Sequence, residues 1–236
     1  MIVGVVDAVV LLMDKRSVLF LVIFAALGLA AYQLKFSTIL GVPSQSFAFF
    51  QFVGPVGGQI LSPVLGVMSV ALVEAGNFLL GGQPFDLTAL IRLFPMMFAA
   101  FYFGTKRKHV VAVPIIAMLL FWAHPEGGQA WYYALYWLIP VAAFLFFKDN
   151  LLARSLGATF TAHCVGSVAF LYAFNIPAAT WVTLIPIVAF ERFSFALGIA
   201  ASCVAISTAL DYLTQKTKYR APLDLRYSLL KAARSA

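Results

Sequence analysis

The chain has 236 residues, of which 63% are hydrophobic and 11% are charged, and its formal net charge is +7. Soluble globular domains carry about 45–50% apolar and about 25% charged residues. The composition therefore excludes a water-soluble fold and predicts a single all-α, polytopic membrane domain. We expect no nucleic-acid partner, because membrane topology can account for the positive charge.

The first residues predict a retained N-terminus. Asp14, Lys15 and Arg16 follow the initial apolar stretch, and no small-residue cleavage site is present, unlike in a secretory signal peptide. The two cysteines, Cys164 and Cys203, lie in separate apolar stretches without metal-ligand spacing. We therefore expect buried, inert thiols, with neither a disulfide nor a metal site, and no cofactor.

Runs of about 20 apolar residues, bounded by charges or by Gly/Pro clusters, predict the membrane spans. In chain order they lie near 17–34, 86–104, 131–147, 153–174 and 180–205, with a shorter span near 109–123. The stretch 45–80 is too long for one span, because a single helix of that length would extend about 54 Å against a hydrocarbon core of about 30 Å. The cluster Gly54–Gly58, which contains Pro55, predicts a short helix of about 10 residues, a tight turn, and a full span from about 58 to 80.

Counting both of these helices as crossings gives about eight spans, in a range of six to eight, and places both termini in the cytoplasm. The outside loops then hold only Lys35, as the positive-inside rule favours. The inside segments hold the other basic residues of the loops and tail, namely Lys15, Arg16, Lys106, Arg107, Lys108, Lys148, Arg154, Lys216, Lys218, Arg220, Arg226, Lys231 and Arg234. We expect a multi-pass plasma-membrane protein with a cytoplasmic or interfacial segment 1–16, a helical bundle 17–213 and a basic cytoplasmic tail 214–236.

Ionisable side chains inside spans indicate function, because burying them in hydrocarbon is costly. Glu74, with Asn77 one turn later, and Arg92 lie equally far from the loop at Gln83, so a helical hairpin would bring Glu74 and Arg92 to one depth. The spacing predicts an ion pair between them. This pair is either a static clamp or part of a ligand site.

A second group, His163 with Glu191 and Arg192, falls near the bilayer midplane in the last two spans. These residues can relay a proton, coordinate a metal or bind a ligand, although for His163 alone satisfied packing is the favoured interpretation. Because Glu191 and Arg192 are about 100° apart on a helix, we expect each to pair with another helix.

A third group surrounds the outer loop at His124–Gly128 and includes Trp131, which is a candidate for stacking on a ligand. Aromatic residues at this position are also typical of an interfacial belt. No H-E-x-x-H, G-x-S-x-G, Walker A or C-x-x-C motif occurs, so the sequence does not indicate an enzyme.

From Val18 to Gly104 the chain resembles the substrate-binding S component of energy-coupling factor (ECF) vitamin transporters. Three features carry the resemblance: a first span with closely spaced small residues, the outer loop Lys35–Gln45, and the stretch FVGPVGGQILSPVLGVMSVALVEAGNFLLGG followed by FDLTALIRLFPMMFAAFYFG. Ala26 and Ala30 match the small-residue surface that in this family docks on the transmembrane coupling subunit. The predicted hairpin 109–147 is additional to the family's usual number of spans.

The resemblance implies capture of a small nutrient or vitamin-like molecule, with delivery by separate coupling and ATPase subunits. A site in the outer half of the membrane would then use Glu74, Asn77, Arg92 and the outer aromatic residues, closed by Gln51 on the short helix. Two alternatives from the residues themselves are an ion- or proton-coupled secondary transporter and an intramembrane enzyme for a lipid or isoprenoid substrate, each using His163 and Glu191.

Overall fold

The computed structural model describes residues 15–39, 42–82, 85–216 and 224–230. Predictions for 1–14, 217–223 and 231–236 lie outside this range. The helical elements are α2 (Lys15–Gln33), α3 (Phe50–Ile60), α4 (Pro63–Leu80), α5 (Leu87–Arg92), α6 (Pro95–Gly104), η1 (Lys108–Val111), α7 (Ala112–Ala123), α8 (Pro125–Gln129), η2 (Trp131–Trp137), α9 (Leu138–Phe146), α10 (Leu151–Phe174) and α11 (Ala178–Lys216).

The structure confirms a mainly helical chain, and its apolar helices are typical of a membrane-embedded protein. Four helical segments are long and apolar enough to cross a bilayer: Pro63–Leu80, Leu87–Gly104, Leu151–Phe174 and Ala178–Lys216. Shorter apolar segments are Val18–Gln33, Lys108–Ala123 and Trp131–Phe146. The 11 residues of α3 extend only about 16 Å, so eight full crossings remain a prediction.

The break in the stretch 45–80 was predicted at the wrong place. Pro55 lies inside α3, and the chain turns instead at Leu61–Ser62, after the glycines. Pro63 occupies the first turn of α4, where a missing N–H costs nothing, and the Ser62 hydroxyl accepts a hydrogen bond from the Leu65 N–H at 3.2 Å. The N-capping signal at Ser62–Pro63 therefore outweighs the Gly/Pro cluster.

The glycines of this stretch allow three helices to approach closely. A Cβ added to Gly58 would lie 1.9 Å from the backbone oxygen of Ala100 on α6, and one added to Gly104 would lie 2.1 Å from the Gly58 oxygen. A Cβ on Gly66 of α4 would lie 2.2 Å from the Gly58 Cα. Gly58 is thus the point at which α3, α4 and α6 cross, as small residues permit in membrane bundles.

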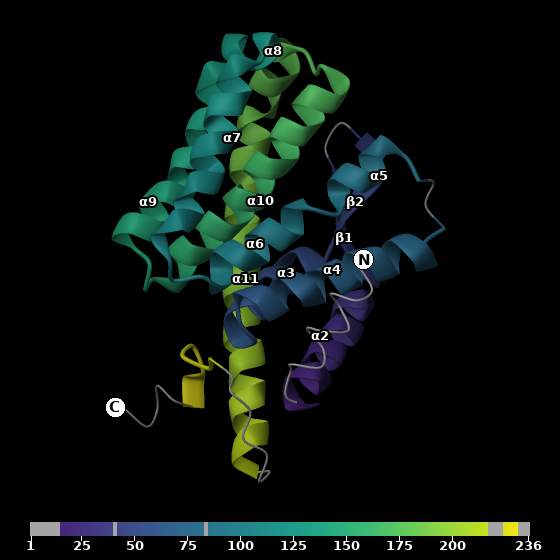
Figure 1. The fold of residues 1–236 in the computed structure, drawn as a ribbon, viewed down its shortest axis with the longest axis vertical. Coiled ribbons are helices and arrows are strands. Elements are labelled where there is room, and N and C mark those ends of the chain that lie inside the picture. Colours follow the sequence, from purple (N-terminus) through teal and green to yellow (C-terminus); the bar gives the residue numbers. More distant parts are fainter. Residues whose placement is uncertain (1–14, 40–41, 83–84, 217–223, 231–236) are drawn as a thin grey trace.

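Two further predicted spans differ in detail. The span 86–104 is interrupted at Leu93–Phe94, before Pro95, and so consists of α5 and α6. The span predicted at 180–205 is the N-terminal part of α11, which continues without interruption to Lys216. Its 39 residues extend about 58 Å, and Figure 1 shows α11 running from the top of the molecule to the bottom.

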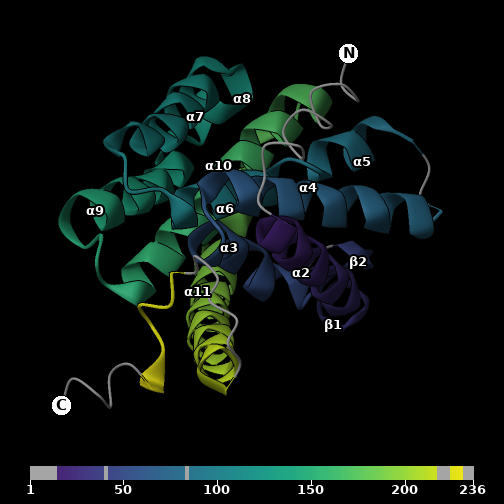
Figure 2. The ribbon, with the colours of Figure 1, turned by 60° about the horizontal axis from the view of Figure 1, so that its bottom comes forward.

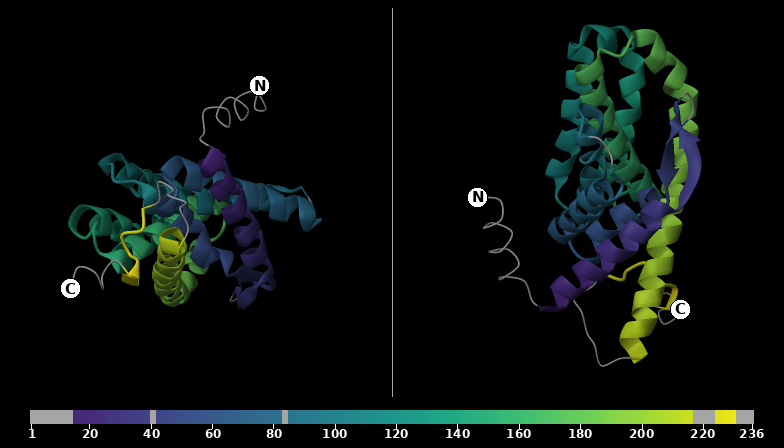
Figure 3. Two further views of the ribbon diagram at one scale, coloured as in Figure 1. Left: turned by 90° about the horizontal axis from the view of Figure 1, so that it is seen from below. Right: turned by 90° about the vertical axis from the view of Figure 1, so that its right-hand side faces the viewer.

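A β-hairpin modifies the all-α prediction. Strand β1 (Lys35–Ile39) pairs antiparallel with β2 (Val42–Ala48) in the segment expected to be an outer loop. Pairing between the two strands provides hydrogen-bond partners for backbone N–H and C=O groups in this non-helical segment. The right-hand view of Figure 3 shows the hairpin standing beside α11, and the Phe47 ring contacts the Phe195 ring of α11 at 4.8 Å between centroids.

The helices form two packed groups that share α10 and α11. One buried core joins α3, α4 and α6 with residues of α10 and α11, and a second joins α7 and η2 with other residues of the same two helices. Figure 2 shows α2 and α4 on one side of the molecule and α7 and α9 on the other. The boundary between the two cores is the place where polar side chains gather.

Candidate functional site

A cavity of about 330 Å³ lies between the two cores. The hairpin and the helices α2 to α6 form one wall, and η2, α10 and α11 form the other. Six of the eight predicted site residues line it: Gln51, Glu74, Arg92, His163, Glu191 and Arg192. Two groups predicted separately from sequence therefore belong to one site.

On the first wall, Glu74 is 4% exposed and accepts a hydrogen bond from the Tyr32 hydroxyl at 3.2 Å. The predicted Glu74–Arg92 ion pair is absent among the described residues, where no oxygen of Glu74 lies within 4.0 Å of an Arg92 nitrogen. The prediction assumed one straight hairpin, but the break before Pro95 changes the direction of the helix that carries Arg92. Arg92 is exposed and lines the same cavity.

On the second wall, two aromatic side chains of η2 hold His163. The Trp137 indole N–H donates to His163 Nδ1 at 3.1 Å, and the Tyr133 hydroxyl lies 2.9 Å from His163 Nε2. The Ser167 hydroxyl lies 3.4 Å from the same nitrogen, one turn further along α10. His163 is thus fully hydrogen-bonded, and its orientation is fixed.

The prediction that Glu191 and Arg192 each pair with another helix is wrong. An Arg192 Nη donates to the Glu191 carboxylate at 3.3 Å, because side chains of this length can meet although their Cβ atoms diverge. The guanidinium lies 4.4 Å from the centre of the Phe195 ring and 5.5 Å from that of Phe47. Such cation–π contacts hold a desolvated Arg firmly in place.

Two predicted residues lie outside the cavity. Asn77 is half-buried on α4, one turn beyond Glu74, and Trp131 is 53% exposed at the start of η2. For Trp131 the interfacial belt is the better interpretation. That interpretation is wrong for Tyr133 and Trp137, which are completely buried.

Sequence reasoning missed several lining residues: Tyr32, Tyr133, Ser167 and Trp181. Tyr133 lies in the aromatic segment that was interpreted as an interfacial belt. Tyr133 and Trp137 are four residues apart, a spacing that puts two side chains on one face of an α-helix but not of the 3-10 helix that forms here, so this spacing does not account for their shared contact with His163. Tyr32 offered no signal, because its hydrogen bond to Glu74 joins residues far apart in sequence.

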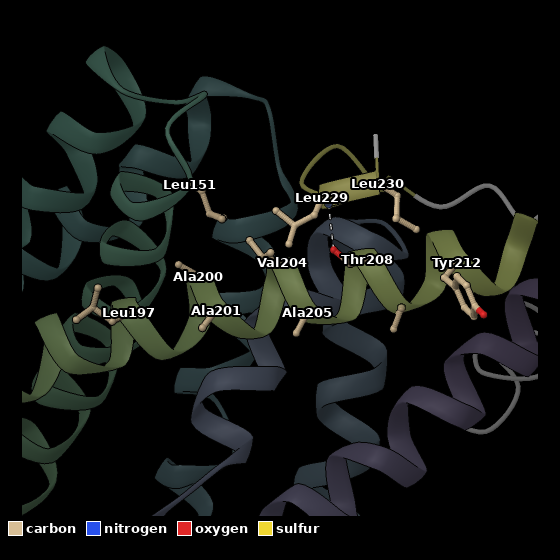
Figure 4. Close-up of a pocket in the computed structure, with 11 residues that line it drawn as sticks. Leu151, Leu197, Ala200, Ala201, Val204, Ala205, Thr208, Tyr212, Leu229 and Leu230 are labelled. Atoms are coloured by element: carbon tan, nitrogen blue, oxygen red, sulfur yellow. Dashed lines mark hydrogen bonds between the residues drawn. The ribbon is translucent and has the colours of Figure 1, made fainter. Parts of the chain in front are cut away.

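A second cavity, of about 900 Å³, is a different feature. Figure 4 shows this groove along α11, where the Leu229 N–H donates to the Thr208 hydroxyl. Its other lining residues are almost all aliphatic: Leu151, Leu197, Ala200, Ala201, Val204, Ala205, Ala209, Leu229 and Leu230, with Tyr212. A site that selects a small polar molecule needs converging polar groups, which this groove does not offer.

The basic segments predicted to be cytoplasmic meet at one end of the bundle, where Lys106, Lys148, Arg154 and Arg226 line a pocket of about 170 Å³. The buried Arg154 guanidinium donates to the Phe103 carbonyl in the last turn of α6, so it caps that helix. This gathering supports the predicted sidedness of the loops.

The described part of the tail is attached to the same end. The Gln59 side chain donates to the Asp224 carbonyl at 2.9 Å, and Arg226 Nε donates to both Asp224 carboxylate oxygens at 3.1 and 3.0 Å. Partial burial alone would raise the pKa of Asp224, but its hydrogen bonds and ion pair with Arg226 hold that pKa below its usual value. The segment Asp224–Leu230 therefore packs against the bundle.

The two alanines that carry the resemblance, Ala26 and Ala30, are both exposed on α2. They share this surface with Leu19, Val22, Ile23 and Leu27. Figure 1 shows α2 at the lower edge of the molecule. This face is accessible from outside the chain, as docking on a coupling subunit would require.

Both cysteines are free and buried, as predicted. Within the described residues, no group of three His, Cys, Asp or Glu side chains is arranged to hold a metal ion.

Comparison with known proteins gives one weak relationship. The chain is 24% identical to an uncharacterized protein, MJ0923, of Methanocaldococcus jannaschii, over 73% of this chain and 65% of the relative. The chain thus spans slightly less than two thirds of the length of this relative. No protein-family model matches, and no solved structure matches.

Proposed function

We propose that this chain is the membrane-embedded substrate-capture subunit of an uptake system for a small nutrient or vitamin-like molecule. A separate module would supply the ATP-driven step, because the sequence has no nucleotide-binding motif. The cavity between the two cores carries the proposal. Its volume of about 330 Å³ suits a small molecule, and it combines aromatic walls with four ionisable side chains, Glu74, Arg92, Glu191 and Arg192.

The exposed small-residue face of α2 supports this proposal independently. Ala26 and Ala30 do not line the cavity. As exposed small residues they would contact a partner protein and not the nutrient. A capture subunit needs both surfaces, one for the ligand and one for the coupling subunit.

Native mass spectrometry of the protein, extracted gently from its own membranes, tests the proposal. We expect a stoichiometric small molecule and co-purifying ATPase subunits. The Glu74→Gln variant keeps an acceptor for the Tyr32 hydroxyl but removes the charge, so it should reduce ligand occupancy at least several-fold. Asn77→Ala, one turn away on the same helix but outside the cavity, is the matched control and should retain the ligand.

A protein that carries only lipid, with no partner, would contradict the proposal. An ion-coupled secondary transporter then becomes the better candidate. The interruptions of helices at Ser62–Pro63 and before Pro95 favour it, because such transporters bind substrate at broken helices. Uptake by cells depleted of ATP but holding an ion gradient separates the two functions, since only the secondary transporter would remain active.

A further inference from the structure

The second wall of the cavity presents hydrogen-bond donors. Arg192 is 7% exposed, and its Nε has no hydrogen-bond partner among the described residues. Buried donors without a partner are rare in folded proteins, because such a group loses its hydrogen bonds to water without replacement. Phe195 and Phe47 hold the guanidinium in place, so Arg192 cannot turn away to find a partner elsewhere. This N–H is therefore an unsatisfied donor on a residue that lines the cavity.

The hydrogen bonds of His163 supply a second donor. An indole N–H can only donate, so His163 Nδ1 must be the acceptor from Trp137 and carries no proton. The ring proton of the neutral imidazole then lies on Nε2, which faces the Tyr133 hydroxyl at 2.9 Å. The Tyr133 oxygen accepts this bond, which leaves its own O–H to donate to another group on a residue that lines the cavity.

The charges that line the cavity limit what this wall can bind. Two acidic side chains, Glu74 and Glu191, and two basic ones, Arg92 and Arg192, line the cavity. Glu191 accepts a hydrogen bond from Arg192, and Glu74 accepts one from Tyr32 on the opposite wall. The donors that remain on the second wall suit a ligand group that offers acceptor atoms.

We infer that the ligand presents a carboxylate to Arg192 Nε and the Tyr133 hydroxyl, an assignment that rests on the proposed capture function. A carboxylate offers only acceptor atoms, so it can accept from both donors without presenting a hydrogen of its own. The rest of the ligand is apolar or aromatic, because the remaining walls include Phe170, Trp181 and Val188. The ligand class is a small, mainly apolar carboxylic acid.

Benzoate and benzamide test this inference, because they have nearly the same shape and differ in charge and in the amide's N–H groups. Thermal unfolding of the full chain in nanodiscs is followed as each compound is added at constant ionic strength. We expect benzoate to raise the unfolding temperature at concentrations at least tenfold lower than benzamide. Arg192→Gln should abolish this preference, and Arg226→Gln, which removes a guanidinium outside the cavity, should retain it.

Tyr133→Phe keeps the buried ring and removes only the hydroxyl, so it tests the second donor even if Arg192→Gln does not fold. We expect it to reduce the preference for benzoate several-fold. Equal stabilisation by the two compounds would overturn the carboxylate assignment but leave the cavity as a binding site and the capture function intact. Stabilisation by neither compound would overturn the assignment, whereas the capture function is decided by the mass-spectrometric experiment.

Discussion

At the scale of single residues, His163 has a positioning role in the cavity wall. Both of its ring nitrogens are engaged, Nδ1 by Trp137 and Nε2 by Tyr133. A proton relay through this imidazole would need Nδ1 to take up a proton, and the Trp137 N–H opposes that. Among the roles that the sequence allowed for His163, the geometry favours packing that orients Tyr133 over proton transfer or metal binding.

This arrangement predicts a single tautomer. In ¹⁵N NMR spectra of labelled protein, His163 should show a protonated Nε2 and an unprotonated Nδ1 from about pH 5 to pH 8, the range in which ordinary histidines titrate. Trp137→Phe removes the donor but keeps an aromatic ring, so both tautomers should then be observed. The signal is assigned with His163→Gln, because the chain also contains His109 and His124. A wild-type Nδ1–H signal would refute the proposed chain of hydrogen bonds.

At the scale of elements, the sequence predicted where helices lie better than where they break. Hydropathy located α2, α10 and the N-terminal part of α11, because apolar length is a local property of the chain. The turn near Gly58 was misplaced because glycine permits two outcomes, a bend or a close helix contact. Gly58 makes a close helix contact because Ala100 and Gly104 of α6 lie against it. These residues are more than 40 positions away in sequence, so the residues around Gly58 do not reveal the contact.

The glycine crossing predicts a large effect from one added methyl group. Gly58→Ala would place its Cβ 1.9 Å from the Ala100 oxygen, a backbone atom that can move only if α6 moves. We expect a destabilisation of about 1–3 kcal/mol or more, as for overpacked cores, seen as a lower unfolding temperature of the purified protein.

Gly166→Ala on α10 is the matched control. Its Cβ would lie 3.5 Å from Pro95 Cγ, an ordinary contact, and Ala is favoured over Gly inside a helix by about 1 kcal/mol. This variant should be as stable as the wild type or more so. If both variants unfolded at the same temperature, the close approach of α3 and α6 would be disproved.

At the scale of the whole molecule, the cavity is lined by residues from two parts of the chain, and their proximity could not be predicted from the sequence. Depth arguments grouped Glu74 with Arg92 and His163 with Glu191, and each member of these groups lines the cavity. The joining of the two groups depends on how the cores pack across α10 and α11, which hydropathy does not determine. The Glu74–Arg92 ion pair failed for the same reason, since it required a helix direction that Pro95 changes.

The packing also gives the molecule two chemically distinct ends. The pocket with Lys106, Lys148 and Arg154 lies at one end, and α8 caps the opposite end in Figure 1. From the positive-inside rule we expect the basic end to face the cytoplasm. The helices α7 and η2–α9 form an apolar hairpin that connects the two ends. One surface position at each end therefore tests both which end faces the cytoplasm and whether this hairpin crosses the membrane.

Cysteine labelling provides that test, because the native Cys164 and Cys203 are buried and should not react. Gln129→Cys lies on exposed α8 and should react with a membrane-impermeant maleimide in intact cells. Lys148→Cys lies between α9 and α10 and should react only after the cells are permeabilised. The unmodified chain is the background control. A reversed pattern would invert the predicted orientation, and reaction of both positions in intact cells would show that this hairpin does not cross the membrane.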